Sequence, residues 1–206
     1  MSLDIKLAIF DLDGVLVDAC EWHRVALNES LKRVCNYEIS MDDHVNEFNG
    51  IPTRVKLQKL TDKGIIPSSM HQVVYDLKQS MTVDIIKENA QVRPEKVELI
   101  ERLREQGIIV ACFTNSIRET AILMLERTGV LPLFDMIVTN QDVENPKPNP
   151  EGYLTIMKHY DILKSNTLIF EDSPKGIKAA YDSGAHVMVV EDIENLTVDR
   201  VKGILK

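Results

Sequence analysis

From residue 93 onward, helical patterns alternate with short apolar runs, and this alternation limits the fold more than any other feature of the chain. The helices are predicted over 95–106, 116–128, 150–160 and 174–182, and the strands over 108–113, 136–139, 167–170 and 186–190. Strands that alternate with helices form a parallel sheet covered by helices on both faces. We therefore expect an α/β fold.

One further strand is expected near the N-terminus. Residues 6–10 form a short, continuous apolar run, which is typical of a strand buried on both faces. Only helical patterns follow, after Val17 and over 41–49, 53–62 and 68–87. The simplest architecture is one α/β core that holds this strand and everything after about residue 90, with a helical insertion between them.

The first inserted helix has a predicted start and one apolar face. Asp18 and Glu21 stand at the spacing of a capping box, which would begin the helix there. Residues at helical spacing then form a stripe that could pack inward. The stripe consists of Trp22, Val25, Ala26 and Leu31.

Charge and hydropathy exclude two classes of partner. The 206 residues carry a formal net charge of −8 without a block of lysines or arginines, the opposite of what a sequence-blind nucleic-acid binder needs. Two aspartates interrupt the N-terminal apolar run, and no stretch is long enough to span a bilayer. Cys20, Cys35 and Cys112 are widely separated and fit buried thiols in a reducing compartment. We expect a cytoplasmic protein without nucleic-acid or membrane partners, and a monomer by size alone.

Polar residues follow four of the predicted strands, either directly or in the loop after the strand. In an open parallel sheet, ligands bind beyond the carboxyl ends of the strands. Four segments that are far apart in sequence would therefore bring polar groups to one edge of the sheet. These groups are Asp11 with Asp13, Thr114 with Asn115 and Ser116, Lys147, and Glu171 with Asp172.

The acidic groups at this edge indicate a divalent cation. Asp11-Leu-Asp-Gly14 also suits a turn or a calcium loop, but no further ligands follow it at alternate positions. Carboxylates delivered by two strands would repel one another unless a cation lay between them, and hard cations prefer such oxygen ligands. We predict Mg²⁺ at this position. The alternative is that these acidic residues are merely solvated at the ends of loops.

Two segments could bind an anion at the same edge. Thr114-Asn-Ser116 ends an apolar strand and opens a helix, where a hydroxyl and free N–H groups can hold phosphate. Taken alone, the segment favours Asn115 or Ser116 as the N-cap of that helix, a role that is compatible with phosphate binding. Lys147 lies in the proline-rich segment 145–150, which would hold its ammonium firmly. An ordinary solvated lysine is the alternative there.

Together these groups describe phosphoryl transfer through a covalent intermediate. The Asp11 carboxylate would attack phosphorus and divide one difficult displacement into two easier ones. Magnesium and Lys147 would neutralise the phosphoryl charge, while the Thr114 hydroxyl orients the phosphoryl oxygens. Asp13 would protonate the leaving oxygen and then take a proton from the water that cleaves the aspartyl phosphate.

These residues resemble the motifs of the haloacid dehalogenase superfamily, in the same order and over nearly the whole chain. The motifs are Asp11-Leu-Asp-Gly-Val-Leu-Val-Asp18, Thr114-Asn-Ser116, Lys147-Pro148 and Glu171-Asp-Ser-Pro-Lys-Gly176. The resemblance implies a Rossmann-like core of residues 1–16 and 90–206, with a helical cap of residues 17–89 inserted after the first strand. It implies phosphate contacts from the second and third motifs. Its implied magnesium ligands are Asp11, Asp13 through its carbonyl, Asp172 and the assisting Glu171.

Within the superfamily the chain is most similar to the β-phosphoglucomutase and sugar-phosphatase branch. His23 is shared by the mutase and related phosphatases, and it fits either packing or substrate contact. Arg54 stands one residue after the position of the mutase's phosphate-gripping arginine and fits either an anion contact or solvent. Arg118 replaces an amide of the mutase. Both departures favour hydrolysis of a small phosphorylated metabolite, a sugar or polyol phosphate.

Two other functions remain as alternatives. A hexose-phosphate mutase would keep the phosphoaspartate until a second hydroxyl arrives, and would depend on a bisphosphorylated activator. A non-enzymatic phospho-acceptor or degenerate binding protein would lack part of the motif set, and no motif residue is missing here. Substrate specificity is expected in the cap, around residues 20–23 and 50–54.

Overall fold

The computed structural model describes residues 3–203 and contains one parallel sheet. The strands are β1 (Leu7–Phe10), β2 (Ile109–Phe113), β3 (Met136–Val138), β4 (Thr167–Glu171) and β5 (His186–Val189), in the order β3-β2-β1-β4-β5. β1 lies at the centre, with Phe10 in register with Cys112 on one side and Phe170 on the other. The predicted α/β fold with a parallel Rossmann-like sheet is confirmed.

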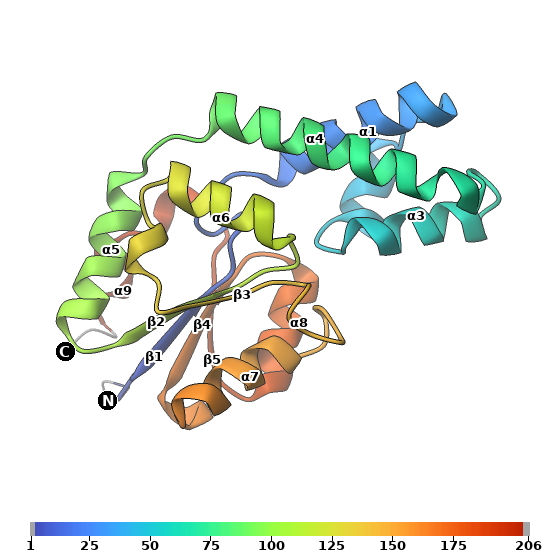
Figure 1. Cartoon of the computed structure of the whole chain (residues 1–206). Helices are drawn as coiled ribbons and strands as arrows, with labels where there is room; N and C mark the ends of the chain where they lie inside the picture. The colour runs from blue at the N-terminus through green and yellow to red at the C-terminus, as the bar shows by residue number, and fades with distance from the viewer. Residues whose placement is uncertain (1–2, 204–206) are drawn as a thin grey trace.

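Helices cover both faces of the sheet (Figure 1). One face carries α5 (Pro94–Glu105), α6 (Arg118–Arg127) and the short α9 (Val198–Val201), and the other carries α7 (Glu151–Tyr160) and α8 (Pro174–Ser183). Alternate residues of β1 enter the two cores: Ala8 and Phe10 on the first face, Leu7 and Ile9 on the second. All four are fully buried, which explains the continuous apolar run of this strand.

The helices inserted after β1 form a cap with an apolar core of its own. They are α1 (Cys20–Cys35), α2 (Met41–Asp43), the π-helical turn η1 (His44–Phe48), α3 (Thr53–Asp62), the 3₁₀ turn η2 (Ser68–Met70) and α4 (His71–Asn89). The cap core consists of Leu27, Leu31, Ile39, Phe48, Leu57, Leu60, Ile66 and Val74. Figure 1 shows α1 and α4 side by side, with α3 below them. Further 3₁₀ turns are η3 (Leu131–Leu133), η4 (Lys164–Asn166) and η5 (Ile193–Asn195).

The predicted start of the first inserted helix is wrong. α1 begins at Cys20, after Ala19, and no side chain caps it. The chain before it is still part of the turn after β1, because the Ala19 N–H bonds the Val17 carbonyl (2.9 Å). Glu21 therefore lies in the first helical turn, where it bonds Arg24 instead of the backbone.

Other local predictions were partly right. In the predicted stripe, Ala26 and Leu31 are buried and Trp22 packs against the core, but Val25 is 42% exposed. The helix expected over 41–49 is divided into α2 and η1, and the one expected over 68–87 begins as a 3₁₀ turn. Of the free cysteines, only Cys112 is fully buried. No helix within residues 3–203 is long and apolar enough to cross a bilayer.

Candidate active site

The turn after β1 lies directly against the end of β4. Asp11 follows the buried strand and is itself only 6% exposed. Gly14 adopts φ +91°, and a Cβ added there would lie 2.1 Å from Asp172 Oδ2. Only glycine fits both this backbone conformation and this close approach. The turn therefore brings the acidic groups of two strands together, as the sequence predicted.

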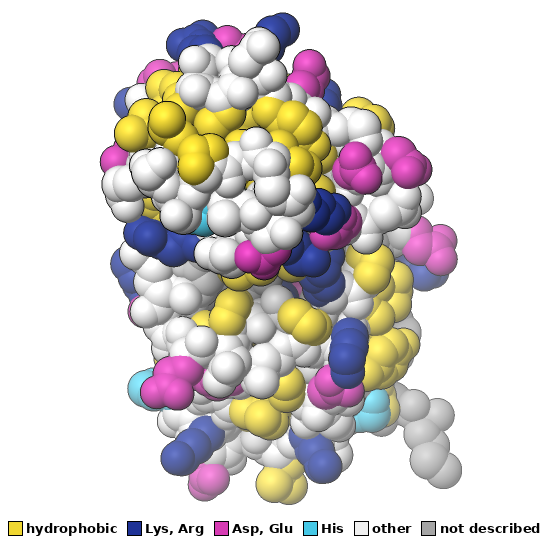
Figure 2. Space-filling view, turned by 90° about the vertical axis from the view of Figure 1, so that its right-hand side faces the viewer, with side chains coloured by type: hydrophobic (Ala, Val, Ile, Leu, Met, Phe, Trp, Pro, Cys, Tyr) yellow, Lys and Arg dark blue, Asp and Glu magenta, His cyan; other side chains and the backbone are white. Residues whose placement is uncertain are grey.

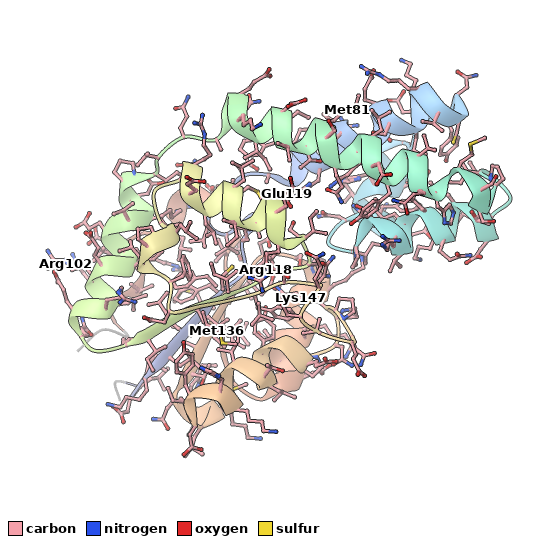
Figure 3. All side chains as sticks on the ribbon, viewed as in Figure 1. Met81, Arg102, Arg118, Glu119, Met136 and Lys147 are labelled. Atoms are coloured by element: carbon pink, nitrogen blue, oxygen red, sulfur yellow. The ribbon has the colours of Figure 1, made fainter. Side chains whose placement is uncertain are left out.

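Lys147 lies among the buried carboxylates, on a loop at the edge of the sheet beneath the cap (Figure 3). Its Nζ donates to Asp11 Oδ1 (2.6 Å), to Glu171 Oε1 (2.6 Å) and to the Phe113 carbonyl (2.7 Å). Burial alone would lower the pKa of this ammonium, but the charges of Asp11 and Glu171 raise it well above its usual range. The alternative of a solvated lysine is therefore wrong. The Tyr153 hydroxyl also donates to Glu171 Oε1 (2.7 Å).

Asp13 lies at the same edge with a different set of partners. Its carboxylate accepts hydrogen bonds from His23 Nε2 (2.9 Å), Ser116 Oγ (2.9 Å) and Thr114 Oγ1 (3.3 Å). Burial opposes ionisation, but the hydrogen bonds from His23 and Ser116 keep the pKa of Asp13 below its usual range. Asp13 is consequently held as a carboxylate in the resting site.

His23 joins the cap to this carboxylate. Lys78 Nζ, on α4, lies 3.1 Å from His23 Nδ1. A lysine ammonium can only donate, so Nδ1 must accept and Nε2 carries the proton that bonds Asp13. Burial and the Lys78 charge both lower the pKa of His23, which favours this neutral ring. His23 is thus part of the site, and packing alone does not describe its role.

The predicted capping role of the segment after β2 is wrong. α6 has Ile117 at its N-cap position, without a side-chain cap. The Asn115 amide instead donates to the Gly50 carbonyl (2.9 Å) and the Lys147 carbonyl (3.1 Å), and its oxygen accepts from the Lys147 N–H (3.0 Å). Asn115 therefore ties the cap loop to the lysine loop, and its side chain is engaged by backbone groups.

The two arginines singled out in the sequence lie in different places. Arg54 lines a cavity between the cap and the core, and its guanidinium stacks over the Tyr75 ring, 4.5 Å from the centroid. Arg118 is exposed at the start of α6 and pairs with Asp142 (2.7 Å) (Figure 3). Trp22 packs beside the core and does not line this cavity.

A cavity of about 360 Å³ lies between these core residues and the cap. Figure 2 shows Lys and Arg side chains across the middle of one face, where the cap above meets the core below. The cap contributes Lys56, Lys78 and His44 to the cavity lining, none of which the sequence analysis selected. A signal was present for Lys78: it continues the four-residue spacing of the buried face of α4, with Val74 before it.

The acidic groups fit a divalent cation. Asp11, Glu171 and Asp172 each offer a ligand atom, and these atoms lie within 4.8 Å of one another. Asp172 Oδ1 is buried and has no hydrogen-bond partner within the described part of the chain. Burial and the neighbouring carboxylates raise the pKa of Asp172 to about 7 and that of Asp11 well above its usual range. A bound cation would remove this penalty, and hard divalent ions prefer such ligands.

Asp172→Asn is expected to stabilise the protein in EDTA. The folded pKa of Asp172 lies above its ordinary value of 3.8, so the carboxylate costs stability that grows from about pH 4 to about pH 7. The variant should melt about 5 °C or more above wild type at pH 7.5, and at a similar temperature at pH 4. Mg²⁺ should raise the melting temperature of wild type but not that of Asp172→Asn.

Thermal unfolding at both pH values, with EDTA or Mg²⁺, measures this. Asp182→Asn, on the exposed end of α8, is the control and should match wild type within about 1–2 °C. A variant that Mg²⁺ stabilises as strongly as wild type would contradict a cation site at Asp172.

Comparison with known proteins identifies the family of this fold and site. Residues 8–190 match the model of the haloacid dehalogenase-like hydrolases. The chain is 29% identical over 185 residues to a phosphorylated carbohydrates phosphatase from Thermotoga maritima, covering 87% of this chain and 82% of the relative. It is 28% identical over 188 residues to a validoxylamine A 7'-phosphate phosphatase from Streptomyces hygroscopicus subsp. limoneus, with the same coverage.

Solved structures show the same fold. A β-phosphoglucomutase from Clostridium difficile superimposes with a TM-score of 0.83 at 22% identity, over 98% of this chain and 97% of the other. CbbY from Rhodobacter sphaeroides, solved with xylulose-(1,5)bisphosphate, gives 0.82 at 21% identity, over 90% and 85% of the two chains. The family match and the arrangement of Asp11, Asp13, Lys147 and Asp172 agree. The chain therefore belongs to the haloacid dehalogenase-like hydrolase family and is one of its phosphoric monoester hydrolases.

Proposed function

We propose that the protein is a magnesium-dependent phosphatase that hydrolyses a small sugar or polyol phosphate through an aspartyl-phosphate intermediate. One observation carries this proposal: the Asp11 carboxylate is buried against the Lys147 ammonium, with Asp13 and Asp172 in the same cavity. The curated relatives named above are phosphatases of phosphorylated carbohydrates or of a sugar-like phosphate, which supports this class of substrate.

The first half of the reaction would transfer the phosphoryl group to Asp11. Its carboxylate oxygen forms the new bond to phosphorus while the ester bond breaks, and Asp13 gives its proton to the leaving oxygen. Asp13 is ionised in the resting site, so this proton must bind as the anionic ester enters and raises the carboxylate's pKa. Lys147 and the Thr114 hydroxyl lie beside these groups and would hold phosphoryl oxygens.

The second half would return Asp11 to its carboxylate. A water molecule attacks phosphorus, gives its proton to Asp13, and inorganic phosphate leaves. A Mg²⁺ held by Asp11 and Asp172 would neutralise the charge on the phosphoryl oxygens in both halves. Glu171 lies behind these two residues, where Lys147, Tyr153 and the backbone N–H of Asp172 occupy its oxygens.

The cap would close the site against water. We propose residues 17–89 as its limits, since the turn after β1 and the end of α4 flank the inserted helices. His23 and the Asn115–Gly50 hydrogen bond connect this cap to the catalytic edge. The cytoplasmic location and the monomeric state remain predictions of the sequence.

Release of inorganic phosphate from a panel of phosphorylated sugars and polyols tests this function. Activity is expected with Mg²⁺ and should fall by at least about 10²-fold in EDTA, because the carboxylate cluster then lacks its neutralising charge. Adding Mg²⁺ in excess of EDTA should restore it. Folded protein that releases no phosphate from any member of the panel would contradict the proposal.

A further inference from the structure

Lys56 is a buried cation without a partner. It lies on the first turns of α3, is 6% exposed and lines the cavity that also holds Asp11. Within residues 3–203 its ammonium makes no hydrogen bond and no ion pair. Lysines are almost never this buried unless paired. The buried face of α3 includes Leu57 and Leu60, so position 56 could have held an apolar residue.

Asp13 of the core acts on Lys56 and opposes the effect of burial, but no carboxylate within residues 3–203 contacts the Lys56 ammonium. Lys78 is also 6% exposed, and its ammonium bonds the His23 ring and no carboxylate among the described residues, so it supplies no counter-charge. Burial lowers the pKa of Lys56 to about 8, and burial with the Lys56 charge lowers that of Lys78 to about 7. Two buried ammonium groups in one cavity repel each other unless an anion joins them.

Two further sets of polar groups on the cap side could bind a ligand. His44 Nδ1 is buried and has no hydrogen-bond partner among the described residues, and His44 lines the same cavity. α3 begins after Pro52, without a side-chain cap, so its first N–H groups are left for another acceptor. The N-terminus of a helix favours negative charge.

The cavity is therefore divided by charge. Its acidic lining residues, Asp11, Asp13 and Asp172, all belong to the core, where the phosphoryl group would react. The cap side offers cations that no carboxylate of the described residues contacts, although the charge of Asp13 acts on both lysines. A ligand whose phosphoryl group meets Asp11 would direct the rest of its structure toward the cap.

We propose that Lys56 is a specificity-determining residue that binds a second anionic group of the substrate, either a carboxylate or a second phosphate. This inference rests on the phosphatase function proposed above and narrows its substrates to phosphate esters with two anionic ends. The second anion would occupy the space between Lys56, Lys78 and the N-terminus of α3. Sugar phosphates without a second anionic group would leave Lys56 without a partner.

Matched pairs of substrates test this role. 3-Phosphoglycerate against glycerol 3-phosphate reports on a carboxylate, and glucose 1,6-bisphosphate against glucose 6-phosphate reports on a second phosphate. In wild type, the member with two anionic groups should have a kcat/KM about 10-fold or more above that of the other member, in at least one pair. Lys56→Met should remove that preference. It should leave the kcat/KM of the member without a second anionic group within about 3-fold of the wild-type value. The pair that responds identifies the anion.

The control is Lys59→Met, one turn further along α3, where the lysine is half-buried and pairs with Glu47. It should retain the wild-type preference. Lys56→Met should melt at the same temperature as wild type or higher, because a buried unpaired charge costs stability. Lys56→Arg should keep part of the preference. A large fall in melting temperature for Lys56→Met would instead indicate a structural role and overturn the proposal.

Binding to Asp11→Asn protein in Mg²⁺, measured by calorimetry with the same four compounds, separates the two proposals. Equal affinity for both members of each pair, or a preference that survives in Asp11→Asn/Lys56→Met, would overturn the role of Lys56. If wild type hydrolyses neither these compounds nor any member of the panel above, the phosphatase function fails, and this binding comparison still decides whether Lys56 recognises an anion. If both members of each pair are hydrolysed equally well, the phosphatase function stands and the inference fails.

Discussion

Asp11→Asn is expected to lower phosphate release from the best substrate by about 10⁴-fold or more, since loss of a nucleophile has effects of this size. Asparagine has nearly the same shape but cannot form the acyl phosphate. The Lys147 ammonium and the Asp13 carboxylate would remain in place, so the loss would report on the nucleophile itself. Steady-state phosphate release, with enzyme concentration raised for the variant, measures this.

The variant should also be at least as stable as wild type in EDTA. Burial and the carboxylates of Glu171 and Asp172 hold the pKa of Asp11 well above its usual range, so the charged group costs folding energy above its ordinary pKa of 3.8. Asp182→Asn on the surface of α8 is the matched control, and its activity should equal that of wild type. An Asp11→Asn protein that retains a tenth of the activity would rule out the aspartyl-phosphate route.

Lys147→Met is expected to destabilise the protein by about 3–5 kcal/mol and to reduce activity by at least about 10²-fold. The ammonium is buried and bonds two carboxylates and the Phe113 carbonyl. Its removal leaves Asp11 and Glu171 close together with no counter-charge. Urea denaturation at pH 7.5 in EDTA measures the stability, so that a bound cation does not compensate.

A second substitution distinguishes charge from packing. Lys147→Met with Glu171→Gln should recover part of the lost stability, because one of the two unpaired carboxylates is gone, but activity should not return. Lys178→Met is the control: this lysine is exposed, pairs with Asp182, and should cost no more than about 1 kcal/mol. A Lys147→Met protein as stable as wild type would contradict the buried network described here.

The sequence alone determined the sheet and the edge at which these polar groups meet. Helices and strands follow from local spacing of apolar residues, and the bounds expected for the helix at 53–62 agree with those of α3. Parallel strands place their carboxyl ends at one edge of the sheet. The proximity of Asp11, Lys147 and Asp172 could therefore be predicted without knowledge of any contact. The direction of the strands is enough to show that these residues, although distant in sequence, lie close together.

Only the tertiary structure decided which partner each polar group has. Asn115 was a plausible helix cap by sequence, but its amide bonds carbonyl groups of the cap loop and the lysine loop. The hydrogen bond of Tyr153 to Glu171 and the contact of Lys78 with His23 join residues 18 and 55 positions apart. Burial of a side chain and the sign of the charge facing it depend on such long-range packing, and no local pattern encodes them. For the same reason the unpaired ammonium of Lys56 became visible only in the folded cavity.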